Sequence, residues 1–171
     1  KSPAFVAVSK DSSYKTIQDV INADKEGKRI RMGHNGVGGF LPSQVALTSA
    51  LGLKNVAYVG GFTGTADITP ALVRGDIDLE VFSPISSTMQ FVKNGDLRPL
   101  LVLEAQRSPL LPETPTPREL KLPNVEDMEL AATALSGMAV PPGTPKERAD
   151  YLGAMVLSAL RDPAFVDRKS T

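Results

Sequence analysis

The stretch Ile30–Leu51, IRMGHNGVGGFLPSQVALTSAL, contains a complete strand–turn–helix unit. The residues from Ile30 to His34 predict a short strand. A glycine-rich turn at Asn35–Gly39 follows it, and Leu41–Leu51 is an apolar helical stretch that ends at Gly52. A strand that leads through a tight turn into a helix is the repeating unit of α/β proteins.

The same unit recurs on both sides of this stretch. Upstream, a strand at Phe5–Val8 precedes a helix at Lys15–Glu26. Downstream we expect a strand at Asn55–Val59, a helix at Thr65–Arg74, a strand at Ile77–Phe82, a helix at Ile85–Lys93 and a strand at Arg98–Leu103. The alternation predicts an α/β fold, a three-layer sandwich with a mostly parallel sheet and helices on both faces.

The composition changes after this alternating region. Five prolines within Ser108–Pro123 predict an extended surface segment. Beyond it, Leu130–Val140 is an apolar stretch and Pro141–Gly143 predicts a turn. The last predicted element is a helix at Pro145–Leu160, with Thr144 as its cap and proline at the permitted first position.

Composition excludes several classes of function. The 171 residues carry 19 basic and 19 acidic side chains with no basic stripe, so a nucleic-acid partner is not expected. No apolar run reaches the ~18 residues that a membrane span needs. The absence of cysteine excludes thiolate metal sites, and a single histidine excludes a multi-histidine site. We predict neither a metal nor a cofactor.

The glycine-rich turn is the strongest candidate site. Backbone N–H groups that glycine leaves accessible, together with a helix start, favour an anion. The alternative is that these glycines only make a tight turn. A dinucleotide site needs a third glycine where Leu41 stands, and a phosphate-binding loop needs a lysine after the glycines. The candidate residues are His34, Asn35, Gly36, Val37, Gly38, Gly39 and Phe40.

A second loop, Tyr58–Thr65, also joins a predicted strand to a predicted helix. Thr63 or Thr65 can cap that helix or donate to a ligand oxygen. Loops of this kind gather at the carboxyl ends of parallel strands, where small ligands bind in α/β folds. We therefore expect the two loops to share one edge and add Tyr58, Gly60, Thr63 and Thr65 to the candidate site.

No catalytic set accompanies these loops. The sequence has no Gly-x-Ser-x-Gly elbow and no acid–base pair beside either loop, and His34 alone cannot form a triad. We therefore predict a binding protein without catalytic activity. The alternative is a small α/β enzyme, transferase-like, that uses the helix start at Gly39 as an anion site.

Several phrases, read in order, resemble the receptors of tripartite tricarboxylate transporters, the TctC or Bug family. The resemblance spans nearly the whole chain and is carried by Gly36–Gly39, Tyr58–Gly61, Leu72–Asp78, Gly95–Val102, Arg107, Leu111–Thr116, Glu119, Val140–Pro145 and Leu160–Phe165.

The resemblance implies a type II periplasmic-binding-protein-like fold that closes on a small carboxylate. The implied ligand is a di- or tricarboxylate, an acidic amino acid or an aromatic acid, passed in the periplasm to the transporter's membrane components. The implied binding residues are Gly36–Phe40 with the Tyr58–Thr65 loop beside them, and Ser83 lining the cleft.

Two departures from the family pattern stand out. Many relatives have Ser or Thr where this chain has Gly39, and often His where it has Pro42, so one hydroxyl donor is missing. Relatives also carry a further stretch before the equivalent of Phe5, which implies that this chain is a fragment. We then expect residues 1–128 to form the second lobe, and residues 129–171 to hold the hinge return and part of the first lobe. Such a fragment can complete itself by forming a homodimer.

Overall fold

The computed structural model of the chain describes residues 4–37, 39, 41–82, 88–131 and 140–163. The chain separates into two compact units, Lys1–Ala134 and Leu135–Thr171. The boundary that we proposed after residue 128 falls inside a helix, α5, which spans Val125–Ala131.

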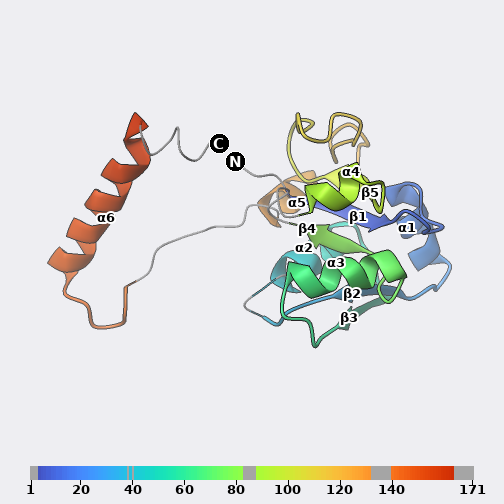
Figure 1. Cartoon of the computed structure of the whole chain (residues 1–171), viewed down its shortest axis with the longest axis horizontal. Coiled ribbons are helices and arrows are strands. Elements are labelled where there is room, and N and C mark those ends of the chain that lie inside the picture. The colour runs from blue at the N-terminus through green and yellow to red at the C-terminus, as the bar shows by residue number, and fades with distance from the viewer. Residues whose placement is uncertain (1–3, 38, 40, 83–87, 132–139, 164–171) are drawn as a thin grey trace. The chain divides into compact units, whose positions relative to one another are not determined.

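The first unit contains five strands and five helices within the described residues, labelled in Figure 1. The strands are β1 (Phe5–Ser9), β2 (Ile30–Gly33), β3 (Val56–Val59), β4 (Glu80–Phe82) and β5 (Leu97–Val102). The helices are α1 (Ile17–Lys25), α2 (Leu41–Ala50), α3 (Thr65–Arg74), α4 (Met89–Lys93) and α5.

The strand β1 lies between β4 and β5 and runs antiparallel to both. Because β4 and β5 both oppose β1, they point the same way. The strands β2 and β3 pair in parallel, and the N–H groups of Asp78 and Leu79 donate to the carbonyl of Arg31, which joins β2 to the start of β4. Among the described pairings, β1 is therefore antiparallel to both of its neighbours, whereas β2 and β3 are parallel. A buried apolar run such as β1 carries no signal of strand direction.

Alternate residues of β1 pack into two separate apolar clusters. Val6 and Val8 lie in a cluster with residues of α1 and α2. Phe5 and Ala7 lie in a second cluster with residues of α3, and side chains of α4 pack against it. Since successive side chains of a strand point to opposite faces, helices cover both faces of the sheet. The predicted three-layer α/β sandwich is confirmed (Figure 1).

The predicted helix at Ile85–Lys93 is represented by α4, because residues 83–87 lie outside the described part. The strand predicted at Ile77–Phe82 begins only at Glu80. Its first residues are instead held by Arg31, whose backbone N–H and guanidinium donate to the carboxylate of Asp78.

The second unit contains one described helix, α6 (Lys146–Arg161). Its N-cap is Pro145 and no side chain caps it, so the predicted Thr144 cap is wrong. The Thr144 hydroxyl donates instead to the carbonyl of Pro141, at 2.7 Å. No residue of α6 is buried, and its exposed apolar side chains are Tyr151, Leu152, Met155, Leu157 and Leu160. No described helix is long and apolar enough to cross a membrane.

A buried carboxylate fixes α1 to the start of β3. Asp24 is 4% exposed and accepts hydrogen bonds from the N–H groups of Lys54, at 2.9 Å, and Asn55, at 2.6 Å. The Asn55 carboxamide donates back to the carbonyl of Asp24, at 2.9 Å. The carboxylate therefore satisfies two backbone donors that have no strand partner at this corner.

We expect Asp24→Ala to lower the free energy of unfolding by about 3 kcal/mol, because it removes two hydrogen bonds from backbone N–H groups to a charged carboxylate. Urea unfolding at pH 7 measures the change. The matched control is Glu26→Ala, which removes an exposed ion pair to Lys28 on the same helix end and should leave the free energy unchanged within error. Equal effects of the two substitutions would contradict this account of Asp24.

Candidate functional site

The histidine that follows β2 organises the first loop. Its backbone N–H donates to the carbonyl of Val59, at 2.9 Å, which extends the β2–β3 pairing by one residue. Its Nδ1 accepts from the N–H of Gly36, at 3.0 Å, so the ring serves as an acceptor inside the loop. The N–H of Gly39 donates to the carbonyl of Gly36, at 3.1 Å. Two of the predicted backbone donors are thus used within the loop itself.

The carboxamide of Asn35 fills the space beside Gly39. A Cβ atom built on Gly39 would lie 1.7 Å from Asn35 Oδ1, so a side chain at position 39 and this carboxamide exclude one another. Gly36 has open space around it but adopts φ 93°, a conformation that favours glycine. Glycine is therefore required at position 36 for its backbone conformation, whereas a side chain at position 39 would have to displace the carboxamide of Asn35.

The second loop is closed by an aspartate of the helix that follows it. The cap of α3 is Gly64 without a side-chain bond, so the capping role predicted for Thr63 or Thr65 is wrong. Asp67 instead accepts from the N–H of Thr63, at 3.0 Å, and from its hydroxyl. These hydrogen bonds, led by the hydroxyl, hold the pKa of Asp67 below its usual range. A carboxylate already occupies this helix start.

Two contacts join the loops, as the sequence predicted for strands that end at one edge. A Cβ atom on Gly60 would lie 3.3 Å from His34 Nε2, so the imidazole packs against the second loop. A Cβ atom on Gly33 would lie 3.0 Å from Phe62 Cε2, so this ring packs against the end of β2. Both approaches depend on a glycine without a side chain.

A buried polar group lies behind the first loop. The carboxyl group of Glu80 accepts from the N–H of Gly33, at 3.1 Å, from Gln44 Nε2, at 2.5 Å, and from the N–H of Val81, at 2.8 Å. Gln44 Nε2 also donates to the carbonyl of Gly33, at 2.6 Å. Burial raises the pKa of Glu80 to about 8, although these hydrogen bonds oppose the rise.

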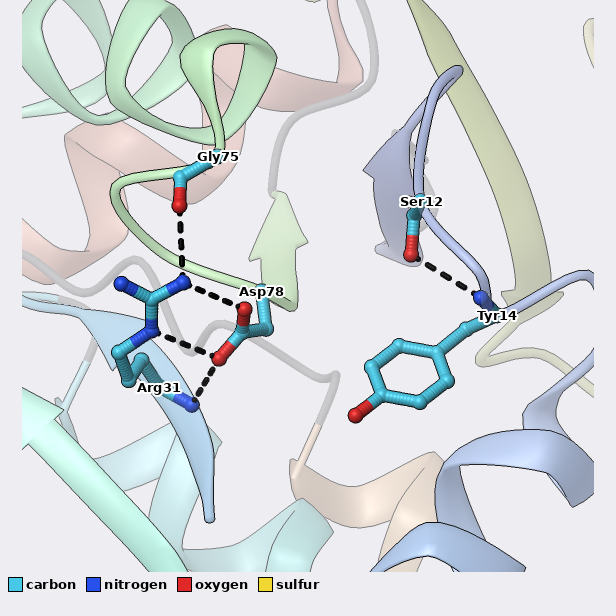
Figure 2. A network of polar contacts seen from close by, with 5 residues as sticks. All are labelled: Ser12, Tyr14, Arg31, Gly75 and Asp78. Carbon is cyan, nitrogen blue, oxygen red and sulfur yellow. Dashed lines mark hydrogen bonds and ion pairs between the residues drawn. The ribbon is translucent and has the colours of Figure 1, made fainter. Parts of the chain in front are cut away.

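The amino-terminal half of β2 is fixed by a separate ion pair. Figure 2 shows the guanidinium of Arg31 between Asp78 and the carbonyl of Gly75, with Nη2 at 2.7 Å from Asp78 Oδ1 and 2.8 Å from the carbonyl oxygen. The Asp78 carboxylate also raises the pKa of Arg31. This contact ties β2 to the segment between α3 and β4, so the loop after β2 starts from a fixed position.

The structure brings together His34, Asn35, Gly36, Gly39 and Gly60. Among the other predicted residues, the side chain of Val37 is 78% exposed, and Thr65 begins α3. The Tyr58 hydroxyl shares a hydrogen bond with Thr48, at 2.6 Å, and so faces α2. Gly38, Phe40 and Ser83 lie outside the described residues.

Sequence reasoning missed Phe62, Gln44 and Glu80. An acidic residue within the apolar run Leu79–Phe82 was a readable signal, since a carboxyl group buried in a strand needs donors from neighbouring elements. The described residues contain no group of three side chains placed to hold a metal ion.

An α/β sandwich in which two strand–loop–helix turns meet at one edge is the fold that this chain shares with a solved periplasmic binding protein. The chain belongs to the tripartite tricarboxylate transporter receptor family, because the sequence profile of that family matches residues 1–170. A search of curated proteins found no match.

Solved structures of this family share the fold. The periplasmic binding protein BugD is 25% identical with a TM-score of 0.65, and the match covers 97% of this chain and 54% of BugD. MatC from Rhodopseudomonas palustris, solved with malate, is 21% identical with a TM-score of 0.67, covering 95% and 53%. An R. palustris protein solved with adipate is 21% identical with a TM-score of 0.65, covering 98% and 54%. The chain thus spans about half the length of the structures that it matches.

Because Gly36 and Gly39 are constrained differently, we expect alanine to lower the free energy of unfolding by different amounts at the two positions. Gly36→Ala should lower the free energy of unfolding by about 1–2 kcal/mol, because alanine is strained at positive φ. Gly39→Ala should change it far less, since the flexible carboxamide of Asn35 can move aside. Urea unfolding measures both, and amide NMR shifts of Asn35 report its displacement in Gly39→Ala. A larger loss in Gly39→Ala than in Gly36→Ala would contradict the described loop.

Proposed function

We propose that this chain forms one lobe of an extracytoplasmic receptor that binds a small carboxylate and passes it to the membrane components of a tripartite tricarboxylate transporter. The lobe comprises residues 1–128, with residues 129–171 as the return toward the other lobe. The observation that supports this function is the junction of the two loops at His34 and Gly60, in a chain of this receptor family. Its location would be the periplasm, as for the matched binding protein BugD.

The surroundings of the first loop favour recognition by neutral donors. From residue 32 to residue 53 the sequence contains no Lys, Arg, Asp or Glu. A ligand carboxylate here would meet backbone N–H groups, the Asn35 carboxamide and the start of α2, whose dipole favours an anion. Gly36 and Gly39 have internal partners, whereas the N–H of Val37 has no partner among the described residues. The N–H of Val37 is therefore the backbone donor that we assign to the ligand, and the Asn35 carboxamide, which lies beside Gly39, is the side-chain group that we assign to it.

The second loop has a different role in this proposal. The Asp67 carboxylate takes both donors of Thr63, and its charge opposes an anion at the start of α3. The second loop would therefore support the site through Phe62 and Gly60, which pack against β2 and His34. The first loop holds the ligand's carboxylate.

The same contacts disfavour the alternative of a small α/β enzyme. The imidazole of His34 accepts from Gly36 through Nδ1 and packs against Gly60. Glu80 is fully buried, and Asp67 is bonded to Thr63. None of these three groups is placed as a general acid or base toward a bound ligand. A receptor needs none.

Calorimetric titration with malate and with adipate tests the function. We expect saturable binding without turnover, and no binding of the corresponding neutral diamides. Asn35→Ala should weaken binding roughly five- to tenfold, the usual effect of one lost hydrogen bond to a charged group. Because no cation is assigned to the site, raising NaCl from about 50 to 500 mM should change Kd by less than about threefold.

Ser12→Ala is the control, since the Ser12 hydroxyl accepts from the N–H of Tyr14 (Figure 2) and belongs to neither loop, so this substitution should leave Kd unchanged. Formation of any product from these acids, or equal binding of the neutral diamides, would refute the proposal.

A further inference from the structure

Among the described acidic residues, only Glu80 has a buried side chain that contacts Gly33, the residue before the first loop. It is 0% exposed, and its Oε2 accepts from the N–H of Gly33, the neighbour of His34. Its Oε1 accepts from Gln44 Nε2 and from the N–H of Val81. All three donors are neutral, and no ion pair to Glu80 occurs among the described residues. The described hydrogen-bond partners of the Glu80 carboxyl group are therefore neutral donors, and none of them carries a charge.

The two protonation states of this carboxyl group are close in free energy near neutral pH. Burial favours the protonated form, while the three N–H donors favour the ionised form, and the pKa lies at about 8. A nearby change of charge can therefore shift the balance between the two forms.

The surrounding ionisable groups have partners of their own. Neither α2 nor β1 contains an ionisable residue. On the other adjoining elements, Arg31 pairs with Asp78, Arg74 with Asp76, Asp67 bonds Thr63, Tyr58 bonds Thr48, and His34 accepts from Gly36. A new negative charge at the first loop would therefore act on Glu80 without a cation between them.

The side-chain amide of Gln44 can form a hydrogen bond with Glu80 in either of its protonation states. With the carboxylate ionised, Gln44 Nε2 donates to Glu80 and to the carbonyl of Gly33, and Gln44 Oε1 is buried without a partner. When Glu80 is protonated, its O–H can donate to Gln44 Oε1 after the amide turns over. That turn removes the donor from the carbonyl of Gly33, so the proton on Glu80 changes how the end of β2 is held.

We propose that Glu80 is a positioning residue of the first loop whose carboxyl group becomes more fully protonated, with the proton drawn from solvent, when a ligand carboxylate binds there. The coupling rests on the proposed function. A bound anion disfavours the ionised form of Glu80, and by linkage the protonated protein binds the anion more tightly. Ligand affinity should then fall as pH rises through about 8. Two like charges ~10 Å apart at an effective dielectric of ~20 give a fall of roughly tenfold.

Calorimetry with malate in two buffers of different ionisation enthalpy measures the proton uptake. At pH 8 we expect the wild-type chain to take up roughly 0.4 proton per ligand, as a one-unit rise from half ionisation gives. Glu80→Gln should take up none and should bind with the same affinity at pH 7 and pH 9. Because both proteins retain His34, the difference between them isolates Glu80. Glu113→Gln, which removes an exposed acid, should behave as the wild type.

A ligand-free measurement separates this coupling from the binding function. Between pH 4.5 and about 8 the folded protein holds a proton that the unfolded chain has released, so wild-type stability should fall with pH relative to Glu80→Gln. If Glu80→Gln does not fold, the Glu80 carboxyl group can be followed directly in the wild type through the pH dependence of its ¹³C shift. The midpoint of that titration should rise by about one pH unit when malate is bound.

Malate binding with the same proton uptake in Glu80→Gln as in the wild type, or an unmoved ¹³C midpoint, refutes the coupling alone. Absence of any saturable binding refutes the proposed function and the coupling together, even where the ligand-free pH dependence is present.

Discussion

Gly33 is the residue at which the parts of the site meet, and it must lack a side chain. A Cβ atom there would lie 3.0 Å from Phe62 Cε2 and 3.1 Å from Ile77 Cδ1. Its N–H donates to Glu80 and its carbonyl accepts from Gln44, so β2, β4 and α2 are joined through one backbone unit. The position of the first loop follows from this junction, because His34 is the next residue. Any larger residue at position 33 would push the second loop away from the first.

Apart from Glu80, the described charged groups near the candidate site are bonded to partners of their own, so none of them presents an unpaired charge to the first loop. The charges of Arg31 on β2 and of Asp78 in the segment before β4 are paired with each other, and Asp67 is bonded to Thr63 of its own loop. A buried carboxyl group among neutral donors keeps its charge unpaired, which is costly unless a proton neutralises it. That cost is what makes Glu80 sensitive to a second anion. An ion-paired carboxylate at the same position would stay ionised with or without ligand.

The sequence predicted those features that depend on periodicity and on glycine turns. The helix α3 has the predicted bounds, Thr65–Arg74, because its apolar spacing is helical and Gly75 closes it in a left-handed conformation. The direction of β1 and the roles of Thr144 and Asp67 could not be predicted, since each depends on which partner the fold brings near. The same is true of the space beside Gly39, which the carboxamide of Asn35 fills. Residue types predicted where a candidate site would lie, and tertiary contacts decided which of its backbone donors already have partners.

The exposed helix α6 bears on how strongly one lobe can bind. A ligand held by a single lobe loses translational freedom but gains only that lobe's contacts, whereas closure between two lobes adds contacts on the opposite side. The chain spans about half of the matched receptors, and α6 leaves apolar residues such as Tyr151 and Leu157 uncovered by its own unit. Weak binding by this chain is therefore expected. The groups that hold Glu80, in contrast, all belong to the first unit, so each ligand that binds should be accompanied by the same proton uptake, however weak the binding is.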